Sequence, residues 1–298
     1  MKQTDEAREY CGLCGVSGKN EVLEDAYLGL HALQHRGQEA AGAMVSDGAD
    51  CYLHRGAGLV DDVFNRCPQR LRELPLRRAI AHCRYSTAGG GGEANAQPLM
   101  VDIVGRKVGI AHNGTITNAR GLRRQLQEEG AILQTTSDTE LILHLVSRSL
   151  VKQHRGDLWA ALADALQHVE GAYCFLVMTR DHLVAVRDPR GFRPLALGEF
   201  ADGSRMVASE TIAFNVTGAS YVREVAPGEM LIIGPDEATE SRRFAEIPRR
   251  AHCIFEHVYF ARPGSYVFGD SVYEVRREMG RRLAQEHPVD ADVVMPIP

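Results

Sequence analysis

Residues 173–187 read YCFLVMTRDHLVAVR, and this stretch is a strong indication of the fold class. Two apolar runs, 173–178 and 183–187, flank the turn dipeptide Arg180-Asp181, which is the pattern of two strands joined by a tight turn. Strands connected over so short a distance are antiparallel. Further β-like runs separated by turn residues extend the pattern, at 97–104, 107–111, 206–209 and 230–233.

Helical patterns are grouped between these runs and do not alternate with them. Residues 21–35 carry apolar side chains at the spacing of one helix face. Asn118, the capping-box sequence Ser137-Asp138-Thr139-Glu140, and Asp157 each precede another helical pattern. Strands in runs with helices set between them predict an α+β fold built on antiparallel sheets.

Length and charge exclude several classes of protein. The chain has 298 residues, which suggests about two domains. A net charge of −5 disfavours a nucleic-acid binder that works through phosphate contacts. The longest apolar run, 172–178, is far shorter than the roughly 20 residues of a membrane helix. Residues 1–10 are polar and unlike a secretory signal, so we expect a cytoplasmic protein with no membrane partner.

A domain boundary is predicted at residues 247–252, a polar stretch that contains proline. The roughly 50 residues that follow are too few for an ordinary domain. An apolar run that begins at 292 stops with the sequence at 298. We therefore expect the last segment to be the truncated start of a second domain.

Seven cysteines stand at 11, 14, 51, 67, 83, 174 and 253. An odd number without an export signal predicts reduced thiols. Cys11-x-x-Cys14 is half a zinc site at most, because no second ligand pair has matching spacing. If residues 1–10 were removed, Cys11 would carry a free α-amine, so that one residue supplies both nucleophile and base.

Three other positions fit a nucleophile that acts on an amino acid. His112-Asn113-Gly114 follows the apolar run 108–111, so we expect it where a strand ends in a turn, and the Asn amide and the Gly N–H could form an oxyanion hole. Arg84 precedes a glycine-rich loop and could clamp a carboxylate in a bidentate pair. Asp138 could pair with an amine.

Six motifs occur in one order that resembles the glutamine amidotransferase half of the amidophosphoribosyltransferase family. They are CGLCGV at 11–16, GLHALQHRGQE at 29–39, HCRYST at 82–87, AHNG at 111–114, SDTE at 137–140 and DPRGFRPL at 188–195. The resemblance implies an N-terminal-nucleophile fold, a four-layer αββα sandwich. It implies a propeptide at 1–10, the glutaminase domain at 11–247 and, at 248–298, the truncated start of an α/β phosphoribosyltransferase domain.

The resemblance also implies roles for individual residues in a purine-synthesis enzyme that takes ammonia from L-glutamine. Cys11 would form a thioester with the substrate, and Asn113 and Gly114 would bind the oxyanion. The substrate would be held by Arg36, Arg84, Thr87 and Asp138. The complete protein would transfer ammonia to phosphoribosyl pyrophosphate with Mg²⁺ and would be a homo-oligomer. Cys253 matches the first ligand of the 4Fe-4S cluster that some relatives carry, and such a cluster would be incomplete in this chain.

Four alternatives remain open from the sequence. The chain could be another class II glutamine amidotransferase, or a catalytically silent subunit if residues 1–10 stay in place. Cys14 offers a competing register for the nucleophile, although the spacing from Cys11 to QHRG at 34–37 favours Cys11. Cys11 and Cys14 could also form a redox switch.

Overall fold

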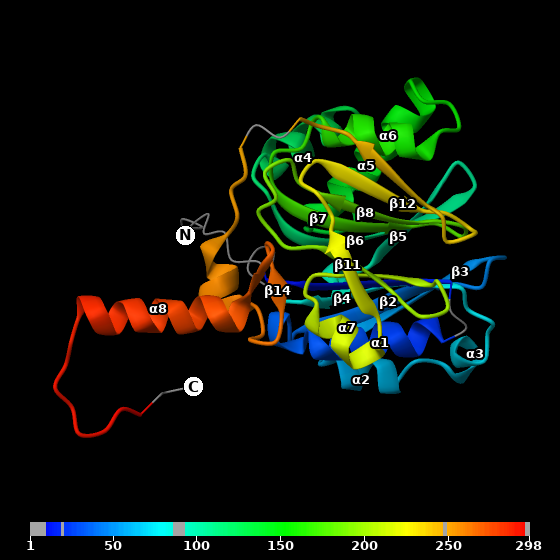
Figure 1. Ribbon diagram of the computed structural model, residues 1–298. Coiled ribbons are helices and arrows are strands. Elements are labelled where there is room, and N and C mark those ends of the chain that lie inside the picture. Colours follow the sequence, from blue (N-terminus) through cyan, green and yellow to red (C-terminus); the bar gives the residue numbers. More distant parts are fainter. Residues whose placement is uncertain (1–9, 19–20, 86–92, 247–248, 296–298) are drawn as a thin grey trace.

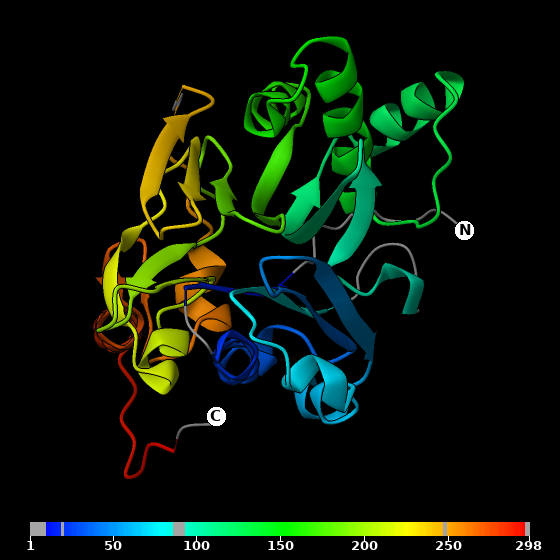
Figure 2. The same cartoon turned by 90° about the vertical axis from the view of Figure 1, so that its right-hand side faces the viewer.

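The computed structural model describes residues 10–18, 21–85, 93–246 and 249–295. Two antiparallel sheets lie face to face, and helices cover the outer side of each (Figure 1; Figure 2). This arrangement confirms the predicted αββα sandwich.

In the described part of the chain, the first sheet (sheet A) has seven strands. Its order is β11 (Ser220–Glu224), β9 (Ala196–Glu199), β10 (Arg205–Ala208), β1 (Gly12–Ser17), β4 (Arg78–Arg84), β2 (Ala40–Ser46) and β3 (Cys51–Ala57). Helices α1 (Val22–Ala32), α2 (Val60–Asn65), α3 (Gln69–Arg72) and α7 (Ile212–Thr217) lie on its side of the sandwich. A 3-10 turn, η1 (Gln34–Arg36), follows α1.

The second sheet (sheet B) has six strands among the described residues. Its order is β13 (Thr239–Arg243), β12 (Glu229–Ile233), β8 (Leu183–Arg187), β7 (Gly171–Met178), β6 (Arg106–Ile116) and β5 (Leu99–Ile103). Helices α4 (Ala119–Glu128), α5 (Thr139–Lys152) and α6 (Leu158–Leu166) lie over its outer face. The short turn η2 (Glu93–Asn95) precedes β5.

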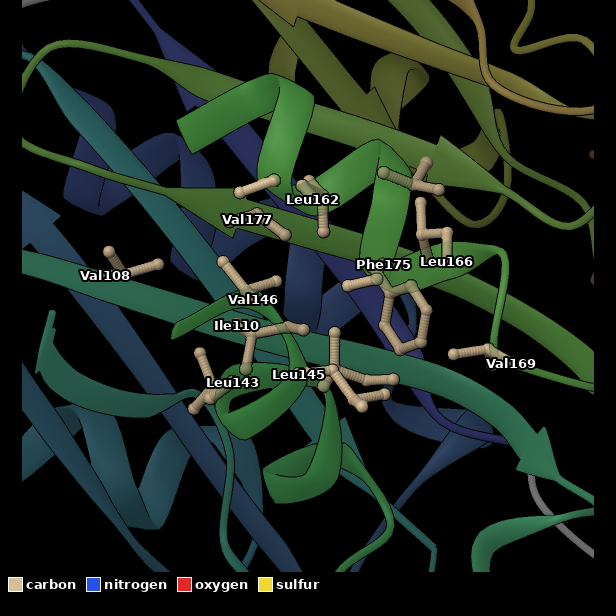
Figure 3. Close-up of a cluster of buried hydrophobic side chains, with 14 of the residues drawn as sticks. Val108, Ile110, Leu143, Leu145, Val146, Leu162, Leu166, Val169, Phe175 and Val177 are labelled. Atoms are coloured by element: carbon tan, nitrogen blue, oxygen red, sulfur yellow. The ribbon is translucent and has the colours of Figure 1, made fainter. Parts of the chain in front are cut away.

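Three cores result from the alternation of side chains along the strands. Val108 and Ile110 of β6, with Phe175 of β7, pack against Leu143 and Leu162 from α5 and α6 (Figure 3). The side chains that alternate with these along β6 and β7 point to the opposite face of sheet B and pack against sheet A. Because β1 alternates in the same manner, each sheet offers one face to helices and one to the other sheet.

The side chains of β1 also alternate between the two faces of sheet A. Leu13 belongs to the core between the sheets, whereas Cys14 and Val16 belong to the core under α1. A Cβ on Gly29 of α1 would lie 2.8 Å from the Cys14 sulfur, so helix and strand approach closely at these small residues.

The C-terminal segment packs at one end of the sandwich. It contains the π-helix η3 (Glu256–Phe260), β14 (Tyr266–Val267), β15 (Asp270–Ser271) and α8 (Val272–Glu286), which extends away from the sheets in Figure 1. Val272 is the one buried residue of α8, while Tyr273 and Leu283 are exposed. No helix in the described ranges is long and apolar enough to cross a bilayer.

Most predicted strands are confirmed, but the capping box at 137–140 is wrong. Asp138 is the N-cap of α5. The Glu140 carboxylate instead accepts hydrogen bonds from the backbone N–H groups of Gln134 (2.6 Å) and Thr135 (2.8 Å). The preceding loop needs these acceptors for its own donors, so the glutamate turns toward the loop and away from the cap.

Candidate active site

Cys11 lies directly before β1 at the end of sheet A and is 4% exposed. Strand alternation places Cys11 on the same side as Leu13, which faces sheet B. Its sulfur is 4.0 Å from the backbone oxygen of Tyr85, the residue that follows β4. Cys11 thus stands at a sheet end, beside the loop that continues from Arg84.

Cys14 lies on the opposite side of β1, under α1. It is fully buried, and burial, with smaller contributions from Asp25 and Cys83, raises the pKa of its thiol far above the ordinary range. A thiol that cannot ionise is a poor nucleophile. Because Cys11 and Cys14 face different cores, the geometry also disfavours a disulfide between them.

Asn113 faces Cys11's sheet from the other side of the sandwich. Asn113 is two residues after Ala111, which belongs to the core between the sheets, so both side chains lie on the face of β6 that points toward sheet A. Asn113 is fully buried, and neither its amide oxygen nor its amide nitrogen has a hydrogen-bond partner among the described residues. An amide buried without partners costs free energy and is expected where a ligand completes it.

Gly114 lies within β6, whereas the sequence placed the Asn-Gly pair in a turn after the strand; the strand continues to Ile116. Its φ is +143°, and a Cβ at this position would lie 2.0 Å from the backbone oxygen of Ala172 on β7. The strand can therefore continue past this point only with glycine.

Among the described residues, no strand pairs with the edge of β6 beside Gly114. The pairing of β6 with β5 ends at Ile110, opposite Leu99. Beyond it, the His112 and Ile116 N–H groups donate to side chains, and Thr117 donates to Glu170 on the other side. Backbone N–H groups alternate between the two sides of a strand, so the Gly114 N–H lies on the open side, between two occupied donors.

Sheet A and β6 are joined beside Asn113 by His82 of β4. The His82 Nε2 donates to the backbone oxygen of His112 at 3.0 Å. Burial lowers the pKa of His82 to about 3, so the imidazole is neutral and holds one proton for this bond. The same strand, β4, ends at Arg84 beside Cys11. Cys11 and Asn113 therefore lie at the same end of the sandwich.

Asp138 lies at the start of α5, on the open side of β6. One carboxylate oxygen accepts from the Ile116 N–H at 2.9 Å, and the other is 3.4 Å from Nδ1 of His112. Burial opposes ionisation, but the charge and hydrogen bond of His112 outweigh it and lower the pKa of Asp138. The aspartate is therefore a carboxylate near neutral pH.

Arg84 is buried at the end of β4, where its backbone oxygen accepts from the Glu39 N–H at 3.1 Å. A Cβ on Gly37 would lie 2.5–2.7 Å from Arg84 backbone atoms, so only glycine allows this approach. Thr87, the other residue expected beside Arg84, lies outside the described residues.

Arg36, which the resemblance expects to bind substrate, lies at the end of η1. Its side chain is fully buried, and it pairs with Glu210 at 2.5 Å and with Glu256. Burial by itself lowers the pKa of the guanidinium, but the charges of Glu256 and Glu210 raise it overall. Two carboxylates thus hold Arg36 in a buried ionic cluster.

That cluster was not found in the sequence, because its members are far apart in the chain. Glu210 also accepts from His35, the backbone of Arg262 and the hydroxyl of Ser265. Glu256 also pairs with Arg193 at 3.3 Å. The cluster attaches the C-terminal segment to sheet A's helix layer.

An aromatic group beside Cys11 was also missed. The ring of Tyr10 lies 3.8 Å from that of Phe260 and 5.6 Å from that of Tyr85. The Arg193 guanidinium stacks on Tyr10 at 5.6 Å. The residue before the candidate nucleophile is thus held against the C-terminal segment.

Cys253 is half-buried, and its sulfur is 3.9 Å from a guanidinium nitrogen of Arg193. The described residues contain no group of three or more His, Cys, Asp or Glu side chains arranged for a metal. A 4Fe-4S cluster needs four ligands, so the described residues supply at most the one expected at Cys253.

Comparison with known proteins agrees with this arrangement. Residues 82–216 match the glutamine amidotransferase domain. The chain is 44% identical to an amidophosphoribosyltransferase of Bacillus subtilis, over 97% of this chain and 60% of that protein. It is 45% identical to one from Rhizobium etli, over 99% of this chain and 59% of that protein.

Solved structures show the same relationship. One described as the allosteric regulatory enzyme of purine biosynthesis superposes with a TM-score of 0.88 at 43% identity, covering 95% of this chain and 59% of that one. The glutamine phosphoribosylpyrophosphate amidotransferase from B. subtilis gives 0.87 at 42%, covering 95% and 60%. The chain thus spans about three fifths of the length of these relatives. The chain is therefore similar over nearly its whole length to amidophosphoribosyltransferases, and its residues 82–216 match the glutamine amidotransferase domain.

Proposed function

We propose that this chain, once residues 1–10 are removed, releases ammonia from L-glutamine. The observation that carries the proposal is Asn113, a fully buried amide without a partner among the described residues that faces the strand of a buried cysteine. A ligand oxygen that develops negative charge would satisfy the Asn113 amide.

The first step uses two groups of Cys11, its α-amine and its thiol. The free α-amine of Cys11 takes the thiol proton, and the thiolate adds to the side-chain carbonyl carbon of glutamine. The carbonyl electron pair moves to oxygen, where the Asn113 amide and the Gly114 N–H stabilise the charge. The tetrahedral species expels ammonia with a proton returned from the Cys11 ammonium. Water then attacks the thioester, releasing glutamate and restoring the thiol.

Two charged side chains bind the amino-acid end of the substrate. Arg84 pairs with the α-carboxylate and Asp138 with the α-ammonium. The lowered pKa of Asp138 supports this role, because a carboxylate is needed to bind a cation. Thr87 assists Arg84 in this proposal.

In the complete protein, we propose that ammonia displaces pyrophosphate from phosphoribosyl pyrophosphate to give phosphoribosylamine, an early product of purine synthesis. The similarity to amidophosphoribosyltransferases supports this assignment. Residues 11–247 form the glutaminase domain and 248–298 begin the phosphoribosyltransferase domain. Mg²⁺ would serve the pyrophosphate chemistry; the described residues offer no site for it, and no step here uses it.

Seven free cysteines support a reducing, cytoplasmic setting. The family resemblance further supports a homo-oligomer, which light scattering of the purified protein tests directly.

The test is intact mass of the purified chain before and after diazo-oxo-norleucine, an alkylating analogue of glutamine. We expect a mass without residues 1–10 and one adduct, located on Cys11 by peptide mapping. The Cys14→Ser variant should still be labelled, and Cys11→Ser should not. A processed chain without an adduct would contradict the proposal, and a full-length mass without an adduct would favour a catalytically silent subunit.

A further inference from the structure

We propose that Gln97 is a positioning residue that fixes the oxyanion-binding strand relative to the carboxylate that binds the substrate amine. The inference rests on the proposed function. Gln97 is buried and lies two residues before β5, at the point where β6 loses its neighbouring strand.

The oxygen end of Gln97 replaces the missing strand. Its Oε1 accepts from the His112 N–H at 2.7 Å, one residue before Asn113. An N–H of a sheet edge buried without an acceptor would cost about 1–3 kcal/mol, so this contact holds β6 in its extended course. The oxygen end therefore positions the oxyanion donors.

The nitrogen end of Gln97 reaches the start of α5. Its Nε2 donates to the Thr139 hydroxyl at 3.0 Å. That hydroxyl is 3.5 Å from a carboxylate oxygen of Asp138 and 3.2 Å from Nδ1 of His112. Gln97 and Thr139 are both buried, so water does not compete for these contacts. The nitrogen end therefore positions Asp138.

These contacts form a ring that the backbone of residues 112–116 closes, so Gly114 is part of it. From His112 the ring passes through Gln97, Thr139 and Asp138, and it returns to β6 at the Ile116 N–H. The Gly114 N–H lies between the two strand positions that the ring holds. Since Gln carries an acceptor and a donor on one rigid amide, it can serve both ends at once. A side chain with only one of these functions cannot.

The experiment measures glutaminase kinetics of the processed protein in three variants. Gln97→Met keeps the volume and removes both hydrogen bonds; we expect kcat to fall by about 10- to 100-fold and KM to rise, because a small misplacement of catalytic groups has that effect. Thr139→Val removes the acceptor of the nitrogen end together with the hydroxyl's contacts to Asp138 and His112, leaves the oxygen end in place, and should raise KM more than it lowers kcat. Thr139→Ser keeps the hydroxyl and should restore wild-type KM.

Ser149→Ala is the matched control for stability. It removes a buried hydroxyl on α5 that donates to Asp164 at 2.6 Å, near the far end of the helix. We expect a stability loss like that of Thr139→Val with unchanged kcat and KM. Wild-type kinetics in folded Gln97→Met, or a KM defect that Thr139→Ser does not repair, would overturn the inference while leaving the proposed function intact. A wild-type protein that releases no ammonia would overturn both.

Discussion

Two buried polar centres of this chain differ in how they are satisfied. At the junction with the C-terminal segment, Glu210 and Glu256 receive donors from Arg36, Arg193 and His35. Between the two sheets, the Asn113 amide has no partner within the described ranges. Both are hidden from water, yet one is saturated and the other is not.

The difference separates structure from function. A saturated buried cluster stabilises the fold only as long as every member stays, because a lone buried charge is costly. An unsatisfied amide costs stability in the free protein and returns it when a ligand binds. Mutation of the saturated cluster should therefore lower stability, and mutation of Asn113 should lower the reaction rate.

The largest effect is expected from Glu256→Gln, which tests the saturated centre. Loss of this charge leaves two buried guanidinium groups with one carboxylate fewer, and we expect the free energy of unfolding to fall by about 3–5 kcal/mol. Urea denaturation measures this loss. Limited proteolysis should cut the segment that follows residue 249 sooner than in the wild-type protein.

The matched control for that substitution is Glu278→Gln on α8. Glu278 pairs with Arg281 in the open, where ion pairs contribute about 0–1 kcal/mol. Equal losses in the two variants would remove the contrast between a buried cluster and an exposed pair.

The next effect concerns the unsatisfied centre. Asn113→Leu keeps the volume and removes the amide, so we expect kcat for glutamine hydrolysis to fall by about 10²–10³-fold. The free energy of unfolding should stay the same or increase, since no protein hydrogen bond is lost.

Asn95→Leu provides the opposite case. The Asn95 amide donates to the Thr136 hydroxyl at 2.8 Å and accepts from the Thr136 N–H at 3.2 Å. Its removal should lower the free energy of unfolding by about 1–3 kcal/mol. A similar loss for Asn113→Leu would mean that Asn113 is a structural residue.

A smaller effect is expected at Asp138. One of its carboxylate oxygens accepts from the Ile116 N–H, and in our proposal the carboxylate also binds the substrate amine. Asp138→Asn should raise KM for glutamine by about 10- to 100-fold, because a charge-assisted hydrogen bond contributes about 1.5–3 kcal/mol. Steady-state kinetics with 2-oxoglutaramate, which lacks the amine, supply the control. If that substrate shows the same rise in KM, Asp138 does not bind the amine.

The last test uses pH. Burial opposes ionisation of Glu210, but Arg36 and His35 outweigh it and lower its pKa to about 2, from an ordinary value of 4.5. A lowered pKa in the folded state stabilises the protein fully above pH 4.5, and this contribution is lost as pH falls toward 2. Thermal unfolding between pH 6 and 2 should show this decline, and Glu210→Gln should be less stable at pH 6 and flatter across the range. A parallel decline in both proteins would assign the acid sensitivity to other groups.

Sequence patterns identified sheet B more completely than sheet A. Strands β5, β6, β7, β8 and β12 were predicted because their apolar runs and turns are strong local signals. Strands β2, β3 and β4 were not, since β2 reads AAGAMVS and is rich in small residues that lack β propensity. Small side chains of β2 and β4 lie in the core under α1 and α2, so these two strands are held by contacts between distant segments.

The candidate site divides in the same way. The sequence by itself identified the candidate residues: Cys11, Asn113, Gly114, Arg84 and Asp138 stand in recognisable local motifs. Only the tertiary structure decided that Arg36 belongs to an ionic cluster, because its partners Glu210 and Glu256 are 174 and 220 residues away. It also revealed Gln97, an ordinary glutamine whose role depends on where β5 stops beside β6. Local patterns fix which groups are present, whereas burial and long-range pairing fix which of them remain available to a ligand.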